Sequence, residues 1–211
     1  PKGSNPYARA KRVQLIEKDL DRAALLFRTA INQGDSIESA VKDLAALLVQ
    51  QGKPQEAIEI MLKNRKRIQD QKSVDNMLIG FYQNAGQYDK AIELLQVKFE
   101  QASTRERRVQ VLWQIANNYL RQQDYVQAEN HFRTVLRLQP DNKAAQRNVA
   151  ICLFKQERYD DAERVLNRIL NMSPDSQAAE LLEAIIKAKA TGQFAKIDEI
   201  IIETTLTDLP R

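Results

Sequence analysis

The chain has 211 residues, of which 43% are apolar and 28% are charged, and its formal net charge is +4. One cysteine, Cys152, and one histidine, His131, exclude an internal disulfide and a zinc site built from the usual Cys/His ligands. No apolar run approaches the roughly 20 residues of a membrane-spanning helix, and the charge is small for a nucleic-acid-binding protein. We therefore expect no metal, no cofactor, no nucleic acid and no membrane among its partners.

Similar segments recur along the chain at a nearly constant spacing. They are GKPQEAIEIML from residue 52, GQYDKAIELLQ from 86, QDYVQAENHFR from 123 and ERYDDAERVLN from 157, with a weaker copy, DLDRAALLFRTAI, before them. The aligned alanines are Ala23, Ala57, Ala91, Ala128 and Ala162. Their spacings are 34, 34, 37 and 34 residues. A period of 34 in helical sequence is typical of the tetratricopeptide repeat.

The repeat pattern predicts an all-α fold, a right-handed tetratricopeptide-repeat solenoid of about five helical hairpins. The hairpins are expected near residues 6–35, 38–71, 72–105, 109–142 and 143–176. A C-terminal helical cap over 177–203, made of AAELLEAIIKAKA and FAKIDEIIIE, follows, with a tail over 204–211. No linker rich in Pro, Gly or Ser divides the chain, so the sequence predicts a single domain. A single hairpin cannot bury its own apolar face, so stability should come from the stacking of neighbouring hairpins.

Glycine and aspartate mark the expected turns. Gly52 and Gly86 fall where a hairpin turns, and there a positive φ costs glycine nothing. Asp141 and Asp175 follow prolines and are expected to cap the next helices. The spacing of 37 places three extra residues within FEQASTRERR, either in a longer loop or in an additional helical turn.

The first helix of each hairpin lines the concave face in solenoids of this kind, so helical spacing nominates residues for partner binding. They are Lys42, Asp43, Asn76, Gln83, Trp113, Asn117, Arg121, Arg147 and Asn148. Together they predict a groove rich in amide side chains, with one large aromatic ring. Asparagine and glutamine can hydrogen-bond the backbone of an extended peptide, and arginine can bind carboxylates or phosphates with two parallel bonds.

Each of these residues also has a purely structural interpretation. Trp113 could pack between hairpins rather than face a ligand, and Asn117 and Asn148 could satisfy neighbouring backbone groups. Lys42 and Asp43 could pair with neighbours on a solvated surface, where ion pairs contribute little to stability.

Three classes of function compete. No Ser/His/Asp order, phosphate loop or metal spacing is present, so we expect no enzyme. The repeat favours an adaptor that binds a peptide segment of a regulatory protein. The alternative is a self-assembling module that forms a homodimer through apolar residues of the cap, namely Ile197, Ile200, Ile201 and Ile202.

The N-terminal part resembles a particular plant family beyond the generic repeat. The segments PKGSNPYARAKRVQLIEKDLDRA, AINQGDSIESAVKDLA, QEAIE, SVDNMLIGFYQNAGQ and NVAICLFKQERYDDA are similar to the male-sterility/pollenless and sulfur-deficiency-induced proteins, over roughly residues 1–165. RAKRVQLIEKD is the most specific part, because the generic repeat does not require it. One departure is the short QASTRERR, where family members carry a long basic insertion.

The resemblance implies a regulatory binding protein that acts in meiotic cell-cycle exit, pollen development or sulfur metabolism. It implies no catalytic residues and a location inside the cell, in the nucleus or the cytoplasm. Lys42, Asp43 and Asn76 match the family pattern and also lie at predicted groove positions, which makes them the first candidates for partner contacts.

Overall fold

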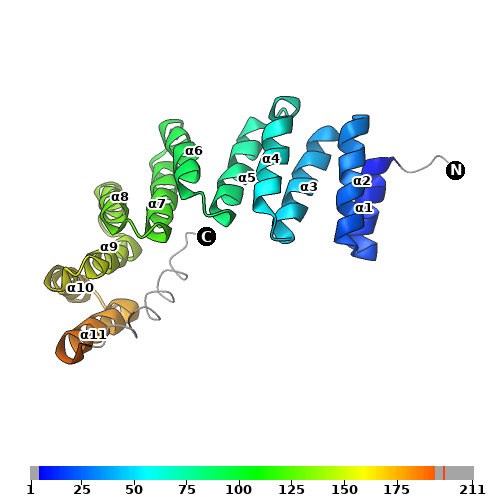
Figure 1. Ribbon diagram of the computed structural model, residues 1–211. Helices are drawn as coiled ribbons and strands as arrows, with labels where there is room; N and C mark the ends of the chain where they lie inside the picture. The colour runs from blue at the N-terminus through cyan, green and yellow to red at the C-terminus, as the bar shows by residue number, and fades with distance from the viewer. Residues whose placement is uncertain (1–4, 193–196, 198–211) are drawn as a thin grey trace. The chain divides into compact units, whose positions relative to one another are not determined.

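A computed structural model describes residues 5–192 and Ile197. Within this part, the chain forms eleven α-helices, one π-helical segment and one short 3-10 helix, with no β-strand (Figure 1). The elements are α1 (Pro6–Arg12), η1 (Val13–Glu17, π), α2 (Leu20–Gln33), α3 (Ile37–Gln50), α4 (Pro54–Asn64), η2 (Arg65–Arg67, 3-10), α5 (Gln71–Asn84), α6 (Tyr88–Glu100), α7 (Arg105–Arg121), α8 (Tyr125–Leu138), α9 (Lys143–Lys155), α10 (Tyr159–Met172) and α11 (Ser176–Thr191). Apart from the buried Ile197, the expected second cap helix and the tail lie outside the described residues.

The chain divides into two compact units, Pro1–Leu94 and Leu95–Arg211. In the first unit, α1 packs on α2, α2 on α3, α3 on α4 and α4 on α5. In the second unit, α7 packs on α8, α8 on α9, α9 on α10 and α10 on α11. Within each unit these packed pairs are neighbours in chain order, which is the arrangement expected of stacked helical hairpins.

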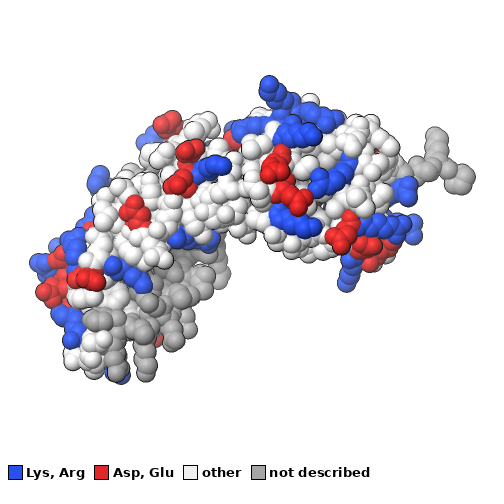
Figure 2. All heavy atoms as spheres, in the orientation of Figure 1, with Lys and Arg blue, Asp and Glu red and all other residues white. Residues whose placement is uncertain are grey.

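Charged residues of both signs share the surface. On the face shown in Figure 2, Lys and Arg side chains are interspersed with Asp and Glu rather than forming one continuous basic area. None of the described helices has the length and apolar character that a membrane crossing requires. Among the same residues, no group of three or more His, Cys, Asp or Glu side chains could hold a metal ion.

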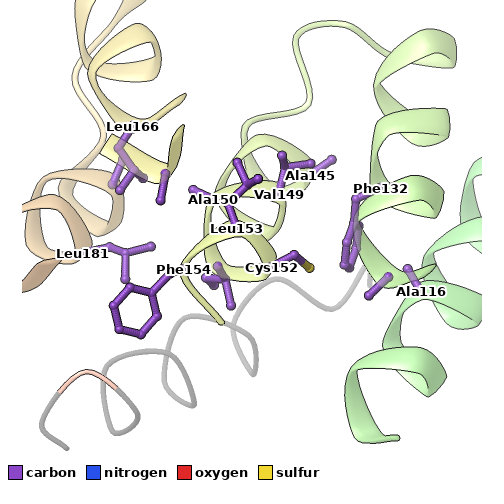
Figure 3. Close-up of a cluster of buried hydrophobic side chains, with 14 of the residues drawn as sticks. Ala116, Phe132, Ala145, Val149, Ala150, Cys152, Leu153, Phe154, Leu166 and Leu181 are labelled. Atoms are coloured by element: carbon purple, nitrogen blue, oxygen red, sulfur yellow. The ribbon is translucent and has the colours of Figure 1, made fainter. Parts of the chain in front are cut away.

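Small side chains let the helices approach each other. The five aligned alanines are all fully buried. In the second unit, Ala128 and Ala162 belong to one core together with larger apolar side chains, and Figure 3 shows part of this core. Phe132 of α8 and Leu166 of α10 contribute to this core from either side of α9. Cys152 lies in the same core, and burial raises the pKa of its thiol far above the usual value, so it is an inert packing residue.

The turns inside the second to fifth hairpins share one backbone conformation. Gly52 and Gly86 have φ values of 74° and 69°, as the sequence predicts. The equivalent turns of the next two hairpins place Gln123 and Glu157 in the same left-handed region, each at 61°. In all four turns the N–H of this residue bonds a carbonyl three positions back, and the following N–H bonds one five positions back. This bond pair is the Schellman motif.

One helix cap differs from the expectation, and the structure decides between the two alternatives for the extra residues before α7. Asn142, not Asp141, caps α9, because its side chain accepts a 2.9 Å hydrogen bond from the Ala145 N–H. Asp175 caps α11 as predicted. The extra residues before the fourth hairpin lengthen α7 to 17 residues, and Thr104 caps its new first turn.

Candidate functional site

In the first unit, Asp43 belongs to an internal network rather than a free surface. Its carboxylate accepts a 2.9 Å hydrogen bond from the Tyr7 hydroxyl and lies 3.2 Å from the Lys11 ammonium. Burial, followed by the hydrogen bond to Asp43, raises the pKa of Tyr7. Asp35 accepts a 2.9 Å hydrogen bond from the Tyr7 backbone N–H. These contacts hold α1 against α3, so several residues of the family-like N-terminal block serve internal packing.

Lys42 is also engaged within the first unit. Its ammonium lies 2.8 Å from a Glu38 carboxylate oxygen and 3.8 Å from an Asp70 oxygen. The Lys42 hydrogen bond is the main cause that lowers the pKa of Glu38. Lys42 and Asp43 therefore both pair with neighbours, which is the structural interpretation that the sequence left open.

The other two residues nominated in this unit lie on α5. Asn76 is exposed and Gln83 is half-buried. They are seven positions apart, so they share one face of the helix. Among the nominated residues of this unit, Asn76 and Gln83 therefore lie on one face of α5.

In the second unit, Trp113 is mostly covered, with 4% of its surface exposed. Its ring meets the edge of Phe132 at a centroid distance of 5.1 Å and an angle of 75°. Trp113 thus packs between α7 and α8, but it also forms part of the wall of a hollow between α7 and α9. The ring of Trp113 is thus a packing residue of the α7/α8 hairpin, and its contact with a ligand stays a prediction.

This α7/α9 hollow has a volume of about 340 Å³. Its lining residues are Glu106, Val109, Gln110, Trp113, Gln139, Asn142 and Ala144. Glu106 and Gln110 are exposed on the first turns of α7. Gln139 accepts a 3.0 Å hydrogen bond from the Asn142 side chain, which already caps α9. Polar groups therefore surround an apolar and aromatic floor, an arrangement typical of peptide and ligand pockets.

Asn117 and Arg121 continue the face of α7 that carries Trp113. Asn117 is half-buried and Arg121 is exposed. The steps of four residues from Trp113 to Arg121 keep these side chains on one helical stripe. The same stripe extends back to Gln110 and Glu106, which helical spacing could have nominated. Gln139 and Asn142 come from the connection before α9, where periodicity gives no signal.

Helical spacing nominated Arg147 and Asn148 for an exposed groove, but both residues are buried. The Arg147 guanidinium is 2.6 Å from Asp175, and the two side chains are only 8% and 6% exposed. Asn148 is buried and donates a 2.9 Å hydrogen bond to the Ala144 carbonyl. Both side chains therefore serve the interior of the second unit.

Comparisons with known proteins agree with this architecture. A family model described as tetratricopeptide repeat matches residues 119–185. Protein POLLENLESS 3-LIKE 2 of Arabidopsis thaliana is 37% identical over 180 residues, covering 74% of this chain and 42% of its own length. Protein SULFUR DEFICIENCY-INDUCED 2 of the same plant is 34% identical over 181 residues, covering 74% of this chain and 59% of its own. The chain thus spans about half the length of the relatives it matches.

Solved structures give the same fold. A tetratricopeptide-repeat protein from Parabacteroides merdae has a TM-score of 0.63 at 19% identity, covering 99% of this chain and 82% of that one. YrrB, described as a TPR protein with an unusual peptide-binding site, has a TM-score of 0.56 at 18% identity, covering 88% and 90%. The all-α helical-repeat solenoid predicted from the 34-residue period is confirmed. The chain is a tetratricopeptide-repeat protein that resembles the POLLENLESS 3 and SULFUR DEFICIENCY-INDUCED proteins of plants.

Proposed function

We propose that this protein is a non-enzymatic scaffold that binds a peptide segment of a regulatory partner at the α7/α9 hollow. The observation that carries the proposal is the hollow itself, in which exposed polar side chains surround an apolar floor with Trp113 in its wall. Gln110 can hydrogen-bond a peptide backbone, while Val109 and Ala144 offer an apolar contact for one side chain of the peptide. Asn117 and Arg121 extend the contact along α7.

The relatives suggest the biological setting. Their names connect them with pollen formation and with the response to sulfur deficiency, and YrrB is a repeat protein with a peptide-binding site. By this similarity, the partner belongs to a regulatory complex of meiotic cell-cycle control, pollen development or sulfur metabolism, in the nucleus or the cytoplasm. In the first unit, Asn76 and Gln83 are the corresponding candidates for partner contact.

A pull-down with altered hollow residues tests the proposal. Trp113→Ala is unsuitable, because removal of a buried ring that packs on Phe132 would leave a cavity in the core. Glu106→Lys combined with Gln110→Ala changes only exposed side chains of the hollow. We expect plant-extract partners bound by the wild type to be lost or strongly depleted with this double variant.

The matched control is Glu93→Lys, a charge reversal at an exposed position of α6, which is the second helix of the third hairpin. It should retain every partner. Equal recovery of partners by the wild type and by the Glu106→Lys/Gln110→Ala variant would remove the hollow from the binding site.

A further inference from the structure

A second and larger hollow lies between α8 and α10, the second helices of consecutive hairpins. Its volume is about 570 Å³. α9 packs on both of these helices (Figure 1) and contributes Gln146, Val149 and Leu153 to the lining. The apolar lining residues are Leu136 of α8, Val149 and Leu153 of α9, Val165 of α10 and Pro140. This α8/α10 hollow shares no lining residue with the α7/α9 hollow.

The rim of the α8/α10 hollow carries an unusual number of arginines: Arg133, Arg158, Arg164 and Arg168. Two carboxylates orient three of them. The nearly buried Glu129 accepts a 2.7 Å hydrogen bond from Arg133 and lies 3.4 Å from Arg158. Asp161 is 2.6 Å from Arg158 and also pairs with Arg164.

The rim therefore has two more positive than negative charges. The hydrogen bonds from Arg158 and Arg164 lower the pKa of Asp161. Its carboxylate is therefore counted as one of the two negative charges. Arg168 has no hydrogen bond or ion pair within the described part of the chain. Arg164 is 78% exposed, and an ion pair so exposed contributes little to stability. Guanidinium groups on this rim thus remain available to an incoming anion.

We propose that the α8/α10 hollow binds an acidic peptide segment that carries an apolar side chain between its carboxylates. The guanidinium groups supply paired N–H donors that match carboxylates. The partly exposed Leu136 and Val165, together with the exposed Pro140, accept the apolar side chain, and the buried Val149 and Leu153 lie beneath them. A single inorganic anion would fill only a small part of this volume and would leave the apolar lining unused. The surface is separate from the α7/α9 hollow, so the inference does not depend on the proposed function.

A fluorescence anisotropy titration with a defined probe tests this inference. The probe is a short fluorescein-labelled peptide that alternates leucine with aspartate and glutamate. We expect saturable binding that weakens when ionic strength rises from about 50 to about 300 mM, because exposed charge pairs are screened. Arg164→Glu combined with Arg168→Glu should weaken binding by at least about tenfold, since it replaces attraction by repulsion on the rim.

Matched controls make the titration decisive. Arg107→Glu, an exposed charge reversal on α7 that does not line the hollow, should change the affinity by less than about twofold. A peptide with asparagine and glutamine in place of the acids, and an acidic peptide with serine in place of leucine, should both bind weakly. Circular dichroism should show that all variants are folded, because each altered side chain is exposed.

Three results would overturn the inference. One is an unchanged affinity in the folded Arg164→Glu/Arg168→Glu variant, and another is equal binding of the uncharged peptide. The third is displacement of the probe by submillimolar inorganic phosphate, which would make the hollow a simple anion site.

Discussion

At the scale of single residues, the turns show where this sequence tolerates strain. The four Schellman turns inside the second to fifth hairpins each need a residue with positive φ, but only two of these four have glycine. Gln123 and Glu157 adopt φ = 61°, a conformation that costs a residue with a Cβ roughly 1–2 kcal/mol. The glycines could be predicted from their place in the repeat. The strain at Gln123 and Glu157 could be inferred only by aligning them with Gly52 and Gly86, because polar residues are common in ordinary loops as well.

Glu157→Gly should therefore stabilise the protein. We expect a gain of about 1 kcal/mol in the free energy of unfolding, because glycine adopts the left-handed conformation without a Cβ clash. Urea unfolding followed by far-UV circular dichroism measures the difference.

The same substitution at Glu180 is the matched control. Glu180 is exposed in the interior of α11, where a helical φ favours glutamate and glycine costs about 1 kcal/mol. The two variants should shift stability in opposite directions. A loss of stability in Glu157→Gly would contradict the strain argument.

The predicted binding residues show what helical periodicity can and cannot give. Spacing correctly placed Trp113, Asn117 and Arg121 on one face of α7. It could not show that Asp43 is engaged by Tyr7, or that Arg147 is covered together with Asp175, because these contacts join residues 36 and 28 positions apart. Which side chains an adjacent helix covers depends on how hairpins stack, and one sequence does not specify this.

At the scale of helices, the Arg147–Asp175 pair connects α9 to the start of α11. Asp175 both caps α11, through the Ala178 N–H, and accepts a 2.6 Å contact from Arg147. Arg147→Ala would leave the Asp175 carboxylate buried without this partner, a loss that typically costs about 3–5 kcal/mol. We expect a drop of that order in the free energy of unfolding.

Removing the buried charge should reverse much of the damage. In the Arg147→Met/Asp175→Asn double variant, asparagine preserves the helix cap and methionine fills part of the volume. Its loss of stability should therefore be clearly smaller than that of Arg147→Ala. A loss below about 1 kcal/mol in Arg147→Ala would mean that the pair behaves as an exposed one.

The length of α7 illustrates a second limit at this scale. The spacing of 37 showed that extra residues were present, but a loop and a helical turn fit the sequence equally well. The structure has the helical turn. The Thr104 side chain accepts a 3.2 Å hydrogen bond from the Arg107 N–H, and this cap lets α7 begin one turn earlier. This added turn carries Glu106 to the rim of the α7/α9 hollow. The feature that looked like an irregularity of the repeat thus supplies part of the candidate site.

At the scale of the whole molecule, the 34-residue period was sufficient to predict the fold, because every hairpin repeats the same small and large apolar positions. The location of a binding site was not predictable to the same degree, because it depends on the residues that stay uncovered after stacking. In the second unit, the two helix layers present hollows of different chemistry. One has polar side chains around an apolar floor with Trp113, and the other is rich in arginine.

Site-specific photocrosslinking tests the central claim, that a partner peptide binds at the α7/α9 hollow, most directly. A photoreactive phenylalanine analogue is placed at position 110, with position 93 as the exposed control and position 168 as the reporter of the α8/α10 hollow. After irradiation with the partners retained in the pull-down, we predict crosslinked partner peptides from position 110 and none from position 93. Crosslinks from position 93 or 168 to the same peptide, with none from position 110, would contradict the proposed binding site.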